Sequence, residues 1–374
     1  MSHLIDLDPE RAMEEFFERG WTDGLPVVPP TPALVSAMVA AVDLAPEDVI
    51  GSIPRRRRTV TVEQAAVNAV MAGCHPSYFP VVVAALGAAL DPAFNAHAAF
   101  TSTGGAATGV VVSGPFAAQI GMNAGHNALG AGNRANATIG RAIRLVARNV
   151  FGAVTGGYDA TSMGNPGRFT LCFAEEEPAA PWVPLRVQLG YAQVDTTVTV
   201  MATEAPRQVA NHLSEVPEDL LRTFLGAITA PSNYIVGKGG QGIVVLCPEH
   251  AQALRQAGWT QSRVKQFLSA ESRVRPEHLT GSGVPLELGN QHDMVPGPDG
   301  KLPTLITEAD VFLVTAGGAG PGWSAYIPAF APSQHIKAVT RRVRLPGEAM
   351  PDCGPDACEV DLSALTRRST AGAS

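Results

Sequence analysis

One stretch of the sequence, residues 121–152, holds most of the side chains whose types and spacing suggest chemistry. It reads GMNAGHNALGAGNRANATIGRAIRLVARNVFG and contains five asparagines, one histidine and a Gly-x-Gly. Asn and Gly favour loops because they tolerate left-handed backbone, and Asn also hydrogen-bonds nearby main chain. We therefore expect residues 121–134 to form an ordered, amide-rich loop, with His126 as a candidate acid or base.

A helical pattern begins after this loop. Ile139, Ile143, Val146 and Val150 recur at three- and four-residue spacing, which predicts a helix from residue 135. A glycine-rich loop that enters a helix leaves N–H groups unpaired beside a positive dipole, which suits a carboxylate, phosphate or enolate oxygen. An alternative is that one asparagine caps the helix and the others hold the loop together. The candidate substrate-binding residues of this stretch are Asn123, Gly130, Asn133, Arg134 and Asn136.

A thiol is the second candidate reactive group. Cys74 lies between the helical pattern of residues 61–73 and the nearly wholly apolar helical pattern of residues 79–90, where a thiol pKa can be lowered. The alternative is a small buried cysteine without reactivity. We expect Cys74 to act as a nucleophile, His126 as the acid or base that tunes it, and Asn127 with the neighbouring amides to orient the imidazole and donate to an oxyanion.

Four further residues from other segments are candidates for the same site. Thr103 lies in the polar loop 101–108, Lys238 in the glycine-rich loop 233–240, and Gly318 in the glycine-rich turn after a predicted buried strand. Glu175 ends a strand predicted at 168–174 and is an acid–base candidate, although three glutamates in a row are typical of a solvated turn. Lys238 would either clamp an anion or be an exposed loop lysine.

An internal repeat predicts the architecture. GVVVSGPFAAQ at residues 109–119 and GIVVLCPEHAQ at 242–252 share glycine, two valines, proline, alanine and glutamine at the same offsets. Each copy predicts a short buried strand followed by a helix, so we expect a mixed α/β fold of two related halves with flanking helices and a site between them. The expected boundaries are 1–203, 204–346 and a weakly ordered tail, 347–374, which contains Cys353 and Cys358.

Composition and charge narrow the class of protein. The chain has 374 residues and a net charge of −7, which argues against nucleic-acid binding. The longest apolar run, 79–90, is too short to span a membrane and the amino terminus is acidic, so a cytoplasmic protein is expected. Five scattered cysteines do not form a disulfide framework. The apolar run either mediates a homodimer or is buried in the core.

Five segments of the chain resemble a bacterial family associated with the UGSC (seleno)proteins. They are WTDGLPVVPPT at 21–31, VEQAAVNAVMAGCHPSYFPVV at 62–82, GMNAGHNALGAGNRANATIGRA at 121–142, IVVLCPEHAQALRQAGW at 243–259 and DVFLVTAGGAG at 310–320. The resemblance implies an enzyme linked to thiol or selenol chemistry. The sequence departs from the family pattern at His75, where a lysine is expected.

These observations predict a soluble enzyme that acts on a small polar or anionic substrate. Thiol and imidazole chemistry of lyase or hydrolase type would cleave a C–S, C–N or C–O bond without a cofactor. One alternative is a divalent-metal-dependent hydrolase or lyase, although the histidines lack metal-specific spacing. Another is a non-catalytic ligand-binding subunit whose partner is a small Cys- or selenocysteine-containing redox protein. The candidate metal ligands are His75, His97, His126, His292 or a glutamate.

Overall fold

The computed structural model describes residues 11–177, 180–212, 214, 216–283, 296–320 and 322–348. In these residues the helices are α1 (Ala12–Glu18), α2 (Pro32–Val39), α3 (Val62–Ala72), α4 (Phe79–Ala89), α5 (Ala96–Thr101), α6 (Pro115–Gln119), α7 (Arg134–Asn149), α8 (Leu185–Gln188), α9 (Pro217–Ile228), α10 (Pro248–Gln256), α11 (Gln261–Glu271) and α12 (Pro276–Thr280). The strands are β1 (Val49–Ile53), β2 (Arg58–Thr61), β3 (Ala107–Ser113), β4 (Leu171–Ala174), β5 (Thr197–Thr203), β6 (Arg207–Ala210), β7 (Gly240–Leu246), β8 (Arg273–Val274), β9 (Leu302–Pro303), β10 (Val311–Thr315), β11 (Trp323–Pro332) and β12 (Val339–Arg342).

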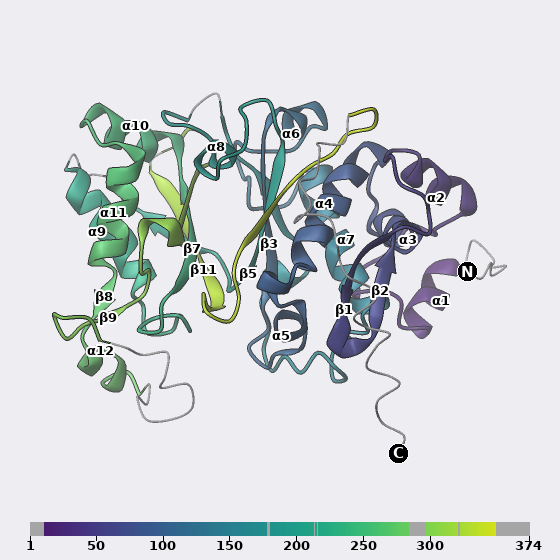
Figure 1. The fold of residues 1–374 in the computed structure, drawn as a ribbon, viewed down its shortest axis with the longest axis horizontal. Helices are drawn as coiled ribbons and strands as arrows, with labels where there is room; N and C mark the ends of the chain where they lie inside the picture. Colours follow the sequence, from purple (N-terminus) through teal and green to yellow (C-terminus); the bar gives the residue numbers. More distant parts are fainter. Residues whose placement is uncertain are drawn as a thin grey trace, which may run out of the picture.

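A mixed sheet forms the centre of the fold (Figure 1). Within the described ranges it has eight strands in the order β10-β7-β11-β5-β3-β4, with β12 paired to β5 and β6 paired to β11. Helices flank it on both sides: α9, α10 and α11 lie beside β11, β7 and β10, respectively, and α4 and α7 lie beside β3, β4 and β5. This arrangement confirms the predicted mixed α/β class.

The two sequence repeats occupy equivalent places in the sheet. The first copy forms β3 and α6, and the second forms β7 and α10. Each repeated strand is central to a three-stranded unit, with a parallel neighbour on one side (β4 or β10) and an antiparallel neighbour on the other (β5 or β11). Ala329 of β11 pairs with Thr203 of β5 and joins the two units. The domain boundaries themselves stay a prediction, since β12 returns from the second half to pair with β5.

Side chains of the two units alternate between an inner and two outer cores, as the period of two along a strand requires. Val110 and Val112 of β3 face the helices of the first half, whereas Val111 faces inward. The inward residues of both units form one shared cluster, which includes Phe173, Ile243 and Phe312. The outer face of β7 packs on α9, α10 and α11 through residues of a third cluster. The inner faces of the two units therefore share one core, and helices cover their outer faces.

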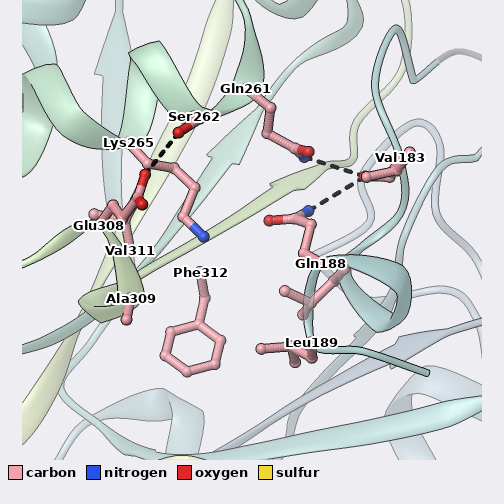
Figure 2. Close-up of a pocket in the computed structure, with 11 residues that line it drawn as sticks. Val183, Gln188, Leu189, Gln261, Ser262, Lys265, Glu308, Ala309, Val311 and Phe312 are labelled. Atoms are coloured by element: carbon pink, nitrogen blue, oxygen red, sulfur yellow. Dashed lines mark hydrogen bonds between the residues drawn. The ribbon is translucent and has the colours of Figure 1, made fainter.

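The short helix α8 connects the halves at the open edge of β10. The Gln188 amide donates to the backbone oxygen of Leu313 at 2.9 Å, and Gln261 of α11 donates to that of Val183 at 3.1 Å. Residues of α8, α11 and the start of β10 line a pocket of about 380 Å³ at this place (Figure 2).

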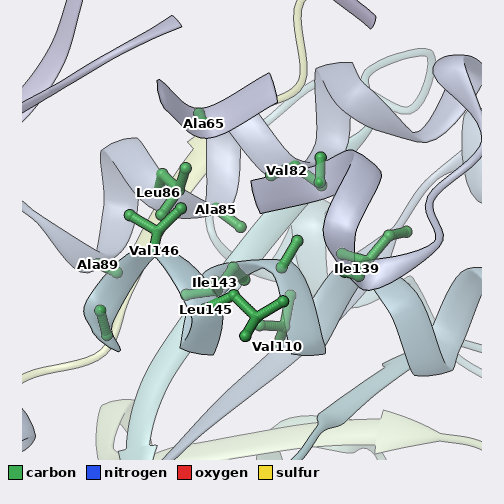
Figure 3. Close-up of a cluster of buried hydrophobic side chains, with 14 of the residues drawn as sticks. Ala65, Val82, Ala85, Leu86, Ala89, Val110, Ile139, Ile143, Leu145 and Val146 are labelled. Carbon is green, nitrogen blue, oxygen red and sulfur yellow. The ribbon is translucent and has the colours of Figure 1, made fainter. Parts of the chain in front are cut away.

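The helix α7 is the main support of the first half (Figure 3). Ile139, Ile143 and Val146 are fully buried against Leu86 of α4 and Ala65 of α3. Side chains cap the first turns of α3 and α7. Thr61 and Gln64 form a reciprocal capping box on α3, and Asn133 caps α7. The apolar helix α4 has most of its residues buried in this cluster, so its hydrophobicity is explained by the core and no longer supports a homodimer.

The amino-terminal segment is tied to α7 by polar contacts. Arg141 forms a two-pronged ion pair with Asp23, with Nε and Nη2 at 2.8 and 2.7 Å from the two carboxylate oxygens. Its Nη2 also donates to the Pro26 carbonyl at 2.9 Å, and Asn149 donates to that of Trp21 at 3.0 Å. The segments 21–31 and 62–82 therefore both contact α7, which belongs to the stretch 121–152.

Most predicted elements agree with the structure, with one notable shift at a strand. The strand predicted to start at Arg168 starts at Leu171, because residues 166–168 form a 3-10 turn that is closed by the Asn165 side chain. Among the described residues, no helix is both long and apolar enough to cross a bilayer. The predicted His292 ligand and the Cys353 and Cys358 tail lie outside the described residues.

Candidate functional site

The loop formed by residues 121–133, here called the amide loop, is held together by its own asparagines. The Asn123 side chain donates to the backbone oxygen of His126 at 2.8 Å and accepts from the Gly125 N–H at 3.0 Å. Asn127 has a left-handed backbone (φ 60°) and donates to the Ala131 oxygen at 2.7 Å. We predicted that these amides would orient the imidazole and donate to an oxyanion. Instead, both amides close turns of the main chain.

The amides at the end of the loop serve the start of α7. Asn133 accepts from the N–H of Asn136 and donates to the Gly121 oxygen at 2.8 Å. Asn136 is 3% exposed and spans the loop, since its amide bonds to both the N–H and the oxygen of Asn123 and to the oxygen of Ala128. The alternative in which these residues cap and brace the loop therefore accounts for them.

Gly130 also has a packing role. A Cβ at Gly130 would lie 2.1 Å from Oδ1 of Asn127, so the glycine is needed for the Asn127 amide to lie over the loop. Gly130 was a candidate for substrate binding. Its backbone N–H instead donates to the Asn127 oxygen at 2.9 Å.

Cys74 is buried between α3 and α7. It is 6% exposed, and burial raises the pKa of its thiol to about 12 despite the opposing effects of the Thr138 hydroxyl and the Arg134 guanidinium. A thiol with that pKa is protonated at neutral pH and is a poor nucleophile. No hydrogen bond joins it to His126 among the described residues, and it packs in the apolar core. The geometry therefore favours the small buried cysteine of the alternative interpretation.

Arg134 links the amide loop to the turn that contains Cys74. It is the first residue of α7 and is exposed, and its Nε donates to the Gly73 oxygen at 2.9 Å. Gly73 ends α3 in the left-handed conformation (φ 90°), which directs its carbonyl toward α7. Arg134 thus anchors the two segments and leaves its other nitrogens at the surface.

The imidazole of His126 lies against the glycine-rich turn of the second half, residues 316–320, here called the glycine turn. A Cβ at Gly318 would be 2.0 Å from Nδ1 of His126, so the ring occupies the space that only a glycine leaves open. The Gly317 N–H donates to the Ala124 oxygen at 2.8 Å and fixes the two loops together. The structure therefore brings His126 and Gly318 into one place, as predicted, with His126 exposed.

The other side of the glycine turn contacts the start of α10. The Gly320 N–H donates to Oε1 of Glu249 at 2.7 Å, and Oε2 of Glu249 is buried without a partner in the described part of the chain. Burial acts to raise the pKa of Glu249, but the Gly320 N–H, its own N–H and the Cys247 thiol outweigh burial and hold the pKa below its usual value. Glu249 is therefore an ionised carboxylate beside the turn that contacts His126, and its buried Oε2 has no hydrogen-bond partner in the described part of the chain.

The residues next to Glu249 belong to a buried polar network. His250 contacts the Ser324 hydroxyl through Nδ1 at 2.7 Å and the Asn211 backbone oxygen through Nε2 at 2.8 Å. Because a carbonyl only accepts, Nε2 carries the proton and Nδ1 accepts from Ser324. Burial lowers the pKa of His250 and raises that of Cys247, so both are neutral supports. Sequence reasoning missed Glu249, whose only signal was its place after the repeated proline, Pro248.

Two predicted residues lie at the opposite ends of the strands. Thr103 precedes β3, where its oxygen accepts from Ser162, and Lys238 precedes β7, where its Nζ lies 3.5 Å from the centre of the Tyr234 ring. His126 and Gly318 follow β3 and β10, respectively. Thr103 and Lys238 are therefore not brought to the contact between the amide loop and the glycine turn.

Glu175 is buried at the end of β4. It is 7% exposed, accepts from the Ser113 hydroxyl at 2.6 Å and accepts from the Leu185 N–H at 2.8 Å. Burial raises its pKa to about 7, because the charged form loses its hydration. The next residue, Glu176, donates its N–H to the Thr315 oxygen at 2.8 Å, so the end of β4 lies beside the end of β10. The carboxyl group of Glu175 holds the start of α8.

No group of three or more His, Cys, Asp or Glu side chains suited to a metal ion occurs within the described ranges. His97 lies on α5 and His75 lies next to Cys74, each away from the glycine turn. The sequence matches no protein-family model and no curated protein. The resemblance to the UGSC-associated family therefore stays a prediction, and function has to be argued from the geometry.

Proposed function

We propose that the protein is a lyase-type enzyme that acts on a small anionic substrate where the amide loop meets the glycine turn. The observation that carries this proposal is the glycine turn itself, which has the exposed imidazole of His126 against Gly318 and the ionised Glu249 against Gly320. The amide loop and the start of α10 thus each bring one proton-handling group to the same short turn. The glycine turn and the start of α10 directly follow β10 and β7, and α/β proteins commonly bind ligands at such strand ends.

The proposed reaction needs no co-substrate. His126 takes a proton from the carbon next to the substrate carboxylate, and the electron pair forms a C=C bond as the adjacent C–O, C–N or C–S bond breaks. The proton then passes from the imidazole to the leaving group. The N–H groups of Gly318 and Ala319 would stabilise the negative charge that develops on the substrate carboxylate, since those of Gly317 and Gly320 already bond to Ala124 and Glu249. Oε2 of Glu249, which has no hydrogen-bond partner in the described residues, would accept a hydrogen bond from a substrate hydroxyl or ammonium group.

Lyase chemistry is preferred to thiol-dependent hydrolysis for a specific reason. Cys74 and Cys247 are both buried, and burial raises the pKa of each thiol. Proton abstraction uses an exposed base and does not need a thiolate. The cytoplasmic location and a small thiol or selenol partner stay part of the proposal as expectations from the sequence.

Hydrogen exchange in D2O tests the proposal without knowledge of the natural substrate. The full chain is incubated with L-malate, L-aspartate or S-methyl-L-cysteine, which carry C–O, C–N and C–S bonds, and proton NMR follows loss of the signal next to the carboxylate. At least one probe should exchange or eliminate, and His126→Ala should slow it by about 100-fold or more. His278→Ala, at an exposed histidine on α12, is the matched control. Equal rates in the two variants would contradict the proposal.

A further inference from the structure

A second place in the molecule has the properties of a ligand site and is not part of the proposed active site. This is the pocket of about 380 Å³ beside α8, here called the lysine pocket, and its volume is within the range of small-molecule sites. Leu185, Leu189, Val311 and Phe312 give it an apolar wall. Its polar groups are those of Gln188, Gln261, Ser262, Lys265 and Glu308.

Gln188 presents an acceptor to the pocket without a partner. Its Nε2 donates to the Leu313 oxygen at 2.9 Å and to the Val183 oxygen at 3.3 Å, which sets the orientation of the amide. Its Oε1 is buried and has no hydrogen-bond partner in the described part of the chain. An unpaired buried acceptor costs free energy, so a ligand that donates to it gains a hydrogen bond without displacing one.

Lys265 presents a cation to the same space. Figure 2 shows its amine directed from α11 toward the space between the Phe312 ring and the Gln188 amide. Within the described residues, no salt bridge or hydrogen bond is made by this amine, and burial lowers its pKa despite the opposite effect of Glu308. A desolvated ammonium group without a counter-ion favours an anionic ligand.

Glu308 does not neutralise this lysine by direct contact. Its Oε2 accepts from the Ser262 hydroxyl at 2.7 Å, which holds the carboxylate at the exposed rim of the pocket (Figure 2). The amine thus remains the charged group that faces the apolar wall.

We infer that the lysine pocket binds a small carboxylate with a flat apolar body and a hydrogen-bond donor. The carboxylate pairs with Lys265, the apolar body lies on Phe312, and the donor bonds to Oε1 of Gln188. The three requirements come from three separate side chains, so the carboxylate and the donor can be tested by different probes. This binding is separate from the reaction proposed for the glycine turn, because neither His126 nor Glu249 lines the lysine pocket.

Titration calorimetry with three related probes tests the inference. 4-Hydroxybenzoate supplies the carboxylate and the donor, benzoate lacks the donor, and 4-hydroxybenzyl alcohol lacks the carboxylate. The wild-type protein should bind 4-hydroxybenzoate at least about tenfold more tightly than either of the others, the value of one charge-assisted or one rescued hydrogen bond. Equal affinity for the three probes, or no binding of 4-hydroxybenzoate at millimolar concentration, would overturn the inference.

Variants of Lys265 test whether 4-hydroxybenzoate binds in the lysine pocket. Lys265→Met should bind 4-hydroxybenzoate at least about tenfold more weakly, because the side chain keeps its length and loses its charge. Lys265→Arg should retain part of the affinity, and Lys337→Met, on a lysine outside the pocket, should bind as wild type does. An unchanged Tm in Lys265→Met shows that the loss is not due to unfolding. His126→Ala should bind normally, so failure here and failure of the proposed reaction are distinguishable.

Discussion

The imidazole of His126 rests on the backbone of Gly318, and this contact joins the two halves of the chain at the loops that follow β3 and β10. The ring fits at this position because Gly318, on the other half, has no side chain to fill the same space. The bond from the Gly317 N–H to the Ala124 oxygen, at 2.8 Å, keeps the two backbones in register.

A methyl group at position 318 should move the imidazole. The Cβ of Gly318→Ala would lie 2.0 Å from Nδ1 of His126, so either the ring or the turn has to shift. We expect exchange activity to fall by about 10- to 100-fold, because a displacement of about 1 Å of a reacting group has effects of that size. The rate of substrate exchange in D2O measures it.

Gly320→Ala is the matched control for this substitution. A Cβ at Gly320 meets no atom within 4 Å, and the N–H that bonds to Glu249 is kept. Its activity should be close to that of wild type. If Gly318→Ala and Gly320→Ala lose activity equally, the contact between Gly318 and His126 does not position the base.

The amide loop shows how far local reasoning from the sequence extends. An asparagine cap on α7 and the two repeated strands were predicted because each depends on residues close in sequence. The alternative bracing role of the asparagines was readable for the same reason. The sequence alone did not decide whether these asparagines brace the loop or bind a substrate, because that depends on what the folded loop faces.

Tertiary contacts explain why Cys74, Lys265 and Gln188 could not be interpreted correctly from the sequence alone. Cys74 lies at a break between two helices, a pattern that suggested reactivity, but α7 covers it and burial dominates its pKa. Lys265 and Gln188 gave no signal in the sequence because an ordinary lysine and glutamine become unusual only when a distant segment closes a pocket around them. The encounter of His126 with Gly318 was expected from the repeat, which predicted that loops of the two halves meet.

The ionisation of Glu175 should make stability depend on pH. Its pKa is 4.5 when exposed and about 7 in the folded protein, so the folded state favours the protonated form. The stabilisation is fully present below pH 4.5 and is lost as pH rises through 7, by up to about 3 kcal/mol at about 1.4 kcal/mol per pKa unit. Chemical denaturation at a series of pH values measures it.

Glu175→Gln should remove this dependence. The amide accepts from the Leu185 N–H and remains neutral at all these pH values, so the wild-type curve should fall relative to that of the variant between about pH 4.5 and 7 and stay lower above pH 7. Glu271→Gln, at an exposed glutamate on α11, should follow the wild-type curve. Parallel curves for wild type and Glu175→Gln would show that the carboxyl group does not titrate near neutrality.

Cys74 should resist alkylation in the folded protein. Its thiol is 6% exposed and has a pKa of about 12, so at pH 8 little thiolate is present and reagents have no access to it. Peptide mapping by mass spectrometry after iodoacetamide treatment should find Cys74 unmodified in the native protein and modified after denaturation. Cys74→Ala should keep its exchange activity and lose about 1 kcal/mol of unfolding free energy from the small cavity. Rapid labelling together with loss of activity would restore the nucleophile hypothesis.

The ion pair between Asp23 and Arg141 should be a major anchor of the amino-terminal segment. Both side chains are at most 15% exposed, and Arg141 also holds two backbone oxygens of that segment. Asp23→Asn would leave a largely desolvated guanidinium without its counter-ion, so the unfolding free energy should fall by about 2 kcal/mol, between the values for exposed and fully buried pairs. Urea denaturation measures it.

The exposed pair of Arg222 and Asp219 provides the comparison, because it joins the same two types of side chain, through one hydrogen bond within α9, and its side chains are 63% and 53% exposed. Asp219→Asn should change the unfolding free energy by less than about 1 kcal/mol, since solvent screens such a pair. Limited proteolysis adds a local readout: Asp23→Asn should expose residues 20–28 to cleavage before α7 unfolds, whereas Asp219→Asn should not. If the two variants are equally stable and equally resistant, the attachment of this segment to α7 rests on the bonds from Asn149 and Arg148 to the Trp21 and Gly20 carbonyls.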